Sequence, residues 1–337
     1  MKIGSIDILK AFLGALELTN SNAFIGTIHV IENGPEPVSY PGLKLTSTGN
    51  STIAMSKNGS APTVDLKYSL DDGETWTQWD FSEISLSDGQ SVCFKGLNTT
   101  FATSTSAYNK FVMTGSIAAS GNIMSIIDDG ACTTTTITTN YCFYGMFYDC
   151  TSLTTAPELP ATTLKIYCYS KMFYNCVSLT TAPELPATTL AKGCYEYMFS
   201  RSSLTTAPKL PATTLKNYCY SSMFSWCYSL TTAPELPATT LANNCYSSMF
   251  YNCKGLTTAP ELPATTLTDS CYASMFSECT NLNYIKCLAT NISATRCTSG
   301  WLSGVAATGT FVKDSSMNDW AKGSSGIPSG WTVQNAA

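Results

Sequence analysis

Histidine, arginine and charge are scarce in this sequence of 337 residues. It has one histidine, His29, two arginines, Arg201 and Arg296, and only 12% charged residues. A single histidine excludes a multi-histidine metal site and argues against a Ser-His-Asp triad. Two arginines and a net charge of −5 argue against a nucleic-acid partner, which requires a basic stripe.

Long apolar runs are also absent. No stretch reaches the roughly 18 apolar residues of a membrane span, and the start lacks a signal-peptide pattern, so we expect neither. A glycan hydrolase would need a constellation of carboxylates, and none stands out, although adjacent acids such as Asp128 and Asp129 leave that alternative open. We therefore expect no enzymatic activity, no cofactor and no metal.

What the sequence does contain is a repeat. The dipeptide Met-Phe begins at positions 146, 172, 198, 223, 249 and 275, with spacings of 26, 26, 25, 26 and 26. The segment LTTAPELPATTL begins at 153, 179, 230 and 256, and at 204 with Lys209 in place of glutamate. A 26-residue unit is too small to bury its own apolar face, so neighbours must stack. We predict a solenoid of six units over residues 119–297.

Each unit is expected to combine a short strand with a short helix. Leu153–Ala156 has the character of a strand, and Pro157 and Pro160 would end it because they lack N–H donors. Apolar residues then recur at every fourth position: Leu164, Cys168, Met172 and Cys176. At about 100° per residue these positions form one stripe, which predicts an amphipathic helix facing the strands.

The order of cysteine, leucine and Leu-Pro, followed by a loop and a Met-Phe-x-x-Cys segment, resembles BspA-like leucine-rich repeats of bacterial surface antigens. The resemblance covers roughly residues 137–290. It departs from the family in its period, 26 rather than about 23, and in methionine where alanine is usual before phenylalanine. The resemblance implies a mainly β fold with short helices, in which an α/β leucine-rich-repeat solenoid presents a recognition surface.

The flanking regions have other patterns. Residues 39–118 alternate in short segments between turns, which predicts a β-sandwich. Within them, Ser69–Trp76 fits the pattern S-x-D-x-G-x-T-W and resembles the hairpin motif of sialidases. This region has no arginine to bind a substrate carboxylate, so we expect a structural hairpin. Residues 298–337 break the repeat and place three tryptophans among glycine and serine, which predicts a C-terminal cap.

Residues 1–32 contain two similar alternating segments, Ala11–Leu18 and Ala23–Val30, and a turn-rich linker follows them. Two such strands cannot form a core alone and need a partner sheet. This start resembles short β-motifs that open many bacteriophage virion proteins. The resemblance implies an attachment segment that binds other virion proteins.

The 15 cysteines fall mostly into two columns, four residues before and four after each methionine. A disulfide or metal ladder is one interpretation. Cysteines eight residues apart on a helix lie about 12 Å apart, too far for a bridge, so buried reduced thiols are favoured. Glutamates form a third column in the repeat: Glu158, Glu184, Glu235 and Glu261. We expect their carboxylates to lie on exposed turns in contact with water, rather than to line a ridge that binds calcium.

Tyr174, Trp226 and Tyr251 are the candidate contact residues. They fall off the apolar stripe, two or three positions after a repeat methionine, and exposed aromatics serve glycan-binding and docking surfaces. We therefore expect a bacteriophage virion structural protein, a fibre or decoration protein, that presents the solenoid to a host-surface glycan or protein. The alternative is a bacterial cell-surface leucine-rich-repeat adhesin. A homo-oligomer is left open.

Overall fold

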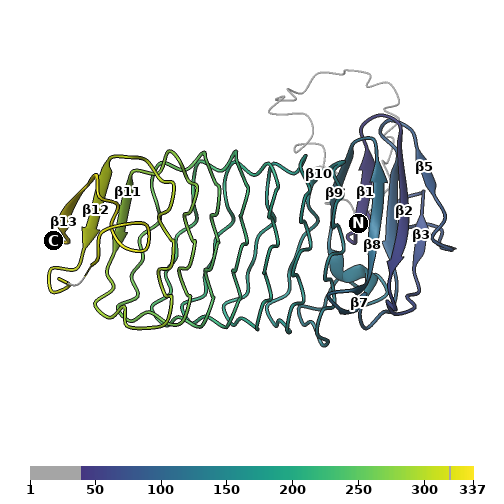
Figure 1. The fold of residues 1–337 in the computed structure, drawn as a ribbon. Helices are drawn as coiled ribbons and strands as arrows, with labels where there is room; N and C mark the ends of the chain where they lie inside the picture. The colour runs from purple at the N-terminus through teal and green to yellow at the C-terminus, as the bar shows by residue number, and fades with distance from the viewer. Residues whose placement is uncertain (1–38, 319) are drawn as a thin grey trace, which may run out of the picture. The chain divides into compact units, whose positions relative to one another are not determined.

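The computed structural model describes residues 39–318 and 320–337. The expected attachment segment, residues 1–32, lies outside this range. Residues 39–337 form one compact unit that is mainly β, with a pair of sheets, a stack of coils and a small final sheet following one another along it (Figure 1).

Two sheets pack face to face at the start of this unit. One has the strand order β10 (Leu153–Thr155), β9 (Ile117–Ser120), β1 (Lys44–Ser47), β6 (Ser91–Lys95), β3 (Lys67–Ser69) and β4 (Thr77–Gln78). The other has the order β5 (Ile84–Leu86), β2 (Ser51–Asn58), β8 (Ala107–Thr114) and β7 (Ala102–Ser104). Alternate residues of β8 are buried, as the period of a strand requires. Phe111 of β8 meets Phe94 of β6 with ring centroids 5.4 Å apart, so the core lies between the sheets.

The first sheet continues directly into the coils. Strand β10, which belongs to the first repeat, pairs in parallel with β9, whereas the other pairs in both sheets are antiparallel. The short 3₁₀ helix η1 (Ile123–Ile126) precedes it. One continuous cluster of buried side chains runs from the sheets through all the repeats, so the two regions share a core.

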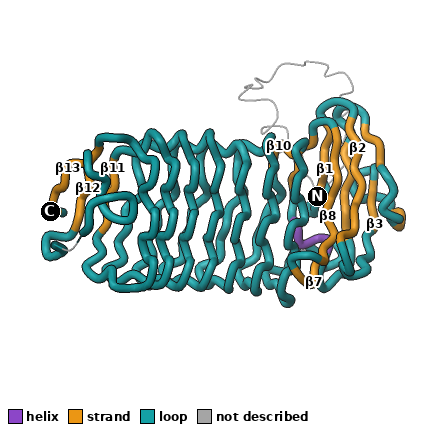
Figure 2. The backbone as a smooth tube through the Cα atoms, viewed as in Figure 1, coloured by secondary structure: helices purple, strands orange, loops and turns teal. Residues whose placement is uncertain are grey.

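The LTTAPELPATTL segments, called here the proline segments, meet through isolated parallel bridges rather than a continuous ladder. Examples are Thr163 with Thr189 and Thr206 with Thr232. Two prolines in each segment have no N–H to donate, which prevents an unbroken strand pairing. Figure 2 accordingly draws most of the stack as loop.

The predicted helices are wrong. The described residues contain almost no helix. Each coil instead contains a run of turns, and these runs are called here the turn ribbon: 140–149, 166–175, 192–201, 217–226, 243–252, 269–278 and 295–304. In the second coil, turns such as Lys165–Cys168 and Tyr169–Met172 close by a hydrogen bond from the fourth residue to the first. The third residue of each has a positive φ, 54° at Tyr167 and 55° at Lys171.

Amides between these turns bond to the next coil. Tyr169 N donates to Cys194 O at 3.0 Å, and Phe173 N donates to Met198 O at 2.9 Å. Beyond its first turn, an α-helix would use its amides internally and leave none for a neighbouring coil. The ribbon therefore repeats every four residues and not every 3.6, which keeps Cys168 and Met172 on one undrifting buried line.

The stack continues into residues 298–337, and the role of these residues as a C-terminal cap stays a prediction. The turn ribbon recurs over 295–304, and three parallel strands end the chain: β11 (Tyr284–Cys287), β12 (Gly309–Lys313) and β13 (Trp331–Asn335). Trp301 stacks on Trp320 at 5.5 Å, and both are buried. The last coils thus continue the repeat with larger aromatic side chains. Across the described part of the chain, no helix has the length and apolar character of a membrane span.

Candidate functional site: the outer face of the turn ribbon

The inward side of the ribbon is packed with aromatic and sulfur side chains and has no accessible chemistry. Phenylalanines stack from coil to coil, as in Phe199 on Phe224 at 5.9 Å. All 15 cysteines are free, and all but the half-buried Cys132 are buried, which confirms the expectation of buried thiols. In the second column each thiol donates to a phenylalanine carbonyl, for example Cys253 Sγ to Phe224 O at 3.0 Å. Burial raises the pKa of the Cys253 thiol well above its usual value, so it is held as an unreactive donor.

The sialidase-like motif forms a hairpin turn between β3 and β4, as predicted. Asp71 accepts hydrogen bonds from Ser69 Oγ at 2.6 Å and from the Thr75 amide at 2.9 Å. Hydrogen bonds from Ser69 and Thr75 lower the pKa of the Asp71 carboxyl to about 2. Trp76 Nε1 donates to Gly73 O at 2.9 Å. These groups satisfy one another, and the motif closes a turn.

Asp128 and Asp129, the acids of the hydrolase alternative, have structural partners. Asp128 accepts backbone N–H bonds from Cys132 and Thr133, each at 3.1 Å, and Asp129 lies 3.9 Å from Lys95 Nζ. Asp128 therefore holds the loop that leads into the first repeat.

Tyrosines line the outer side of the ribbon in successive coils. Tyr148 and Tyr174 stack at 5.0 Å with an angle of 5° between their planes, and Tyr141 and Tyr167 stack at 5.4 Å. Because coils repeat at the spacing of β-strands, equivalent side chains meet as cross-strand pairs. The outer face of these first coils therefore carries tyrosines stacked in pairs.

Lysines lie between these rings. Lys171 Nζ is 6.0 Å from the ring centroid of Tyr144 and 5.6 Å from that of Tyr197. Lys192 Nζ is 5.9 Å from both Tyr167 and Tyr218. Cations within about 6 Å of a ring are attracted to its face. The surface thus combines aromatic rings with lysines, and the acidic Glu196 lies near both Lys171 and Lys192.

The three candidate contact residues all lie on this face, half-buried, but only two of them meet. Trp226 and Tyr251 have ring centroids 5.7 Å apart. Tyr174 instead contacts Tyr148 and Tyr197. That these three residues contact a glycan or protein partner stays a prediction.

A hollow of about 260 Å³ lies beside Trp226. Its lining comes from three successive coils: Asn175, Val177, Arg201, Ser202, Ser203, Trp226, Tyr228 and Ser229. The third repeat is one residue shorter than the others, and the missing residue falls between Ser202 and Leu204. Val177 and Tyr228, which would flank that residue in the adjacent coils, are instead exposed at 46% and 50%. The deletion accounts for the hollow.

Arg201 and Tyr228 were not among the predicted contact residues. The sequence contains two signals that point to this place. The Met-Phe spacing is 25 residues only between positions 198 and 223, and one of the two arginines of the chain, Arg201, lies in that interval. The Arg201 guanidinium lies over the ring of Trp226, with its central carbon 5.2 Å from the centroid.

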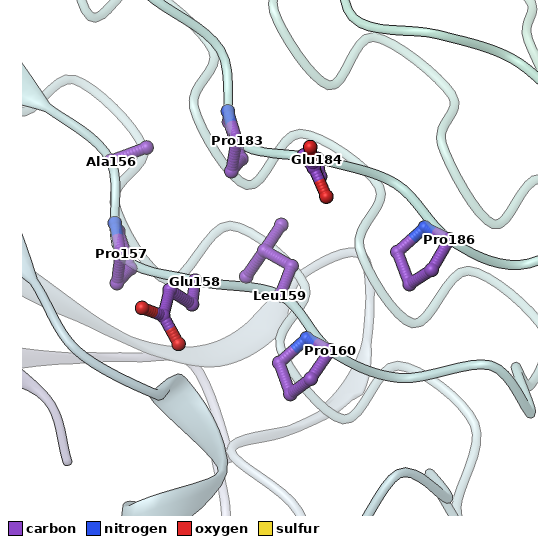
Figure 3. Close-up of a pocket in the computed structure, with 8 residues that line it drawn as sticks. All are labelled: Ala156, Pro157, Glu158, Leu159, Pro160, Pro183, Glu184 and Pro186. Atoms are coloured by element: carbon purple, nitrogen blue, oxygen red, sulfur yellow. The ribbon is translucent and has the colours of Figure 1, made fainter. Parts of the chain in front are cut away.

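A second hollow, of about 530 Å³, lies between the proline segments of the first two coils. Figure 3 shows Glu158 and Glu184 on neighbouring coils, with four prolines around them. Over residues 39–318 and 320–337, no three histidine, cysteine or acidic side chains are grouped as a metal would require. Glu261, at the end of this column, pairs with Lys286 at 3.0 Å. The glutamates are exposed, as expected of solvated turns.

Comparison with protein-family models, curated proteins and solved structures finds no significant match to this chain. The candidate functional site is therefore identified from the structure alone, as the outer face of the turn ribbon with its aromatic rings, its cations and the adjoining hollow.

Proposed function

We propose that this chain is a non-enzymatic bacteriophage virion structural protein, a fibre or decoration protein, that recognises a host-surface glycan or protein. In this proposal the coils form a leucine-rich-repeat solenoid of the BspA-like kind, and residues 1–32 attach the chain to other virion proteins. The observation that carries the proposal is the aromatic and cationic outer face of the turn ribbon. It extends over several coils, and a hollow opens at its edge beside Trp226.

The physical basis is the character of that face. Tyrosine, tryptophan and arginine are the side chains that contribute most to binding at interfaces, because each offers a large contact area with polar groups at its edge. The core beneath is continuous and hydrogen-bonded between coils, so these side chains are held in place before a ligand arrives. No equivalent face is made by the proline segments, whose exposed side chains are mainly glutamate and threonine.

The alternative is a bacterial cell-surface leucine-rich-repeat adhesin, which would use the same face. Mass spectrometry separates the two. The proposal predicts the chain in purified phage particles at a copy number comparable to that of known structural proteins. Its presence in bacterial envelope fractions, and its absence from the particles, would favour the adhesin.

The attachment role of residues 1–32 has its own test. Removal of these residues should leave the thermal unfolding of the remainder unchanged and should prevent incorporation into particles. A truncated chain that is incorporated normally would contradict the assignment.

A further inference from the structure

We propose that the hollow beside Trp226 binds one carboxylate-bearing sugar unit of an acidic surface glycan. This inference rests on the proposed recognition function and names its ligand class. Drug-sized ligands occupy pockets of about 300 to 1,000 Å³, so a hollow of about 260 Å³ suits a single sugar ring rather than a longer ligand.

Two aromatic rings form a corner of the hollow. Trp226 and Tyr228 meet edge to face, with centroids 6.0 Å apart and planes at 86°. Arg201 covers Trp226, whereas half of the surface of Tyr228 is open to solvent. A sugar ring has an apolar C–H face, and an exposed aromatic ring provides a matching surface for it.

The charge at the hollow selects an anion. Among the described residues, Arg201 makes no ion pair within 4.0 Å. The central carbon of its planar guanidinium lies 5.2 Å from the centroid of Trp226, and its paired N–H groups can donate to a ligand in the hollow that Arg201 lines. Such a planar donor pair suits a carboxylate, which it can bind through two parallel hydrogen bonds. Lys254 does not line the hollow, and its Nζ lies 5.6 Å from the centroid of the Tyr228 ring.

A polar acceptor completes the site. Asn175 Nδ2 donates to Asp149 Oδ1 at 2.9 Å, which fixes the orientation of the amide and leaves its oxygen free to accept from a sugar hydroxyl. The hydroxyls of Ser203 and Ser229 line the same hollow. A neutral sugar would use the ring and the hydroxyl contacts but would leave the Arg201 guanidinium unpaired.

The test uses the full chain and two defined probes, an oligomer of galacturonic acid and an oligomer of sialic acid, each beside its methyl ester. Calorimetric titration should show that at least one acid form binds about tenfold or more tightly than its ester, the value expected for charge-assisted hydrogen bonds. Arg201→Gln should abolish this preference, and Arg201→Lys should retain part of it. Lys216→Gln, which removes an exposed cation outside the hollow, is the matched control and should change nothing.

Three results would overturn the inference: no binding of either acid, equal binding of acid and ester, or the same loss in the Arg201→Gln and Lys216→Gln variants. Far-ultraviolet circular dichroism of each variant establishes that it is folded. A chain that fails this test but is still found in phage particles and still binds host cells would leave the proposed function standing and remove only the acidic sugar.

Discussion

The turn ribbon and the proline segments alternate along residues 140–278, yet neighbouring coils are held together differently in the two. In the second coil, amides of the ribbon at alternate positions from Tyr167 to Asn175 donate to the next coil at 2.8 to 3.0 Å. The proline segments of neighbouring coils meet only at isolated bridges. One repeating sequence therefore makes a densely bonded wall and a sparsely bonded one around a single core.

The cause of this difference is local chemistry. Prolines remove donors from one wall. In the other, residues of positive φ close a turn every four residues and direct the remaining amides outward to the neighbouring coil. The densely bonded wall holds aromatic side chains in register, and the sparsely bonded wall presents solvated glutamates. The face suited to recognition is thus the one whose backbone is most firmly held.

The largest expected effect comes from the core behind the ribbon. Phe224 is fully buried between Phe199 and Phe250, so Phe224→Ala should lower the free energy of unfolding by about 3 to 5 kcal/mol. Glu235→Gln, on the exposed proline segment, is the control and should change it by less than about 0.5 kcal/mol. Urea unfolding measures both. If both variants lost similar free energy of unfolding, the core behind the ribbon would not contribute more to stability than the exposed proline segment.

Glu196 provides a test by pH. Burial raises the pKa of its carboxyl to about 7, against the opposing effect of Lys171 and Lys192. The folded state therefore binds the proton more tightly than the unfolded state. Protonated Glu196 therefore contributes its full stabilisation below pH 4.5, and this contribution is lost as the pH rises through 7.

Glu196→Gln should accordingly be more stable than the parent chain at pH 8, by at most about 3 kcal/mol, and equal to it at pH 4. Urea unfolding at the two pH values measures the difference. A gain that is the same at both would show that ionisation of Glu196 is not its cause.

The cysteine column should have a smaller effect. Cys253→Ala removes the donor to Phe224 O and should cost about 1 kcal/mol, since that carbonyl also accepts the Cys227 amide. Cys253→Ser should cost less, because serine occupies the equivalent buried position at Ser202 in the third repeat. Thermal unfolding of the two variants orders them, and a serine variant worse than the alanine variant would refute a donor role for the thiol.

The smallest effect is expected on the proline segments. Lys209 stands between Glu184 and Glu235 in the column, so Lys209→Glu would place like charges in successive coils. It should destabilise the chain by about 0.2 to 1 kcal/mol, less in 1 M salt than in 0.05 M. Lys209→Gln is the matched control. If Lys209→Glu destabilised the chain equally at both salt concentrations, repulsion between the glutamates would not be the cause of the destabilisation.

Much of this architecture could be predicted from the sequence, because its period and turn residues act locally. The repeat, the strands of residues 39–118 and the hairpin at Ser69–Trp76 all follow from spacing and turn chemistry. The helices did not form because the spacing of Cys168, Met172 and Cys176 is strictly four. That spacing fits a ladder of turns better than a helix of 3.6 residues per turn.

The site was predictable only in part, for a similar reason. Trp226 and Tyr251 could be predicted as contact residues because their positions lie outside the stripe of buried apolar residues. The hollow arises from a residue that is missing between Ser202 and Leu204, and its effect on Arg201 and Tyr228 depends on stacking with the coils on either side. The spacing of residues along the sequence does not show how neighbouring coils stack around a missing residue.

The most direct test of recognition by the turn ribbon is binding of the labelled full chain to host cells. Trp226→Ala combined with Tyr251→Ala should weaken this binding about tenfold or more, as expected when central aromatic contacts are removed. Glu235→Gln combined with Lys209→Gln alters two exposed side chains of the proline segments and should leave binding unchanged. Equal binding by the two double variants, each folded, would contradict recognition through the aromatic face.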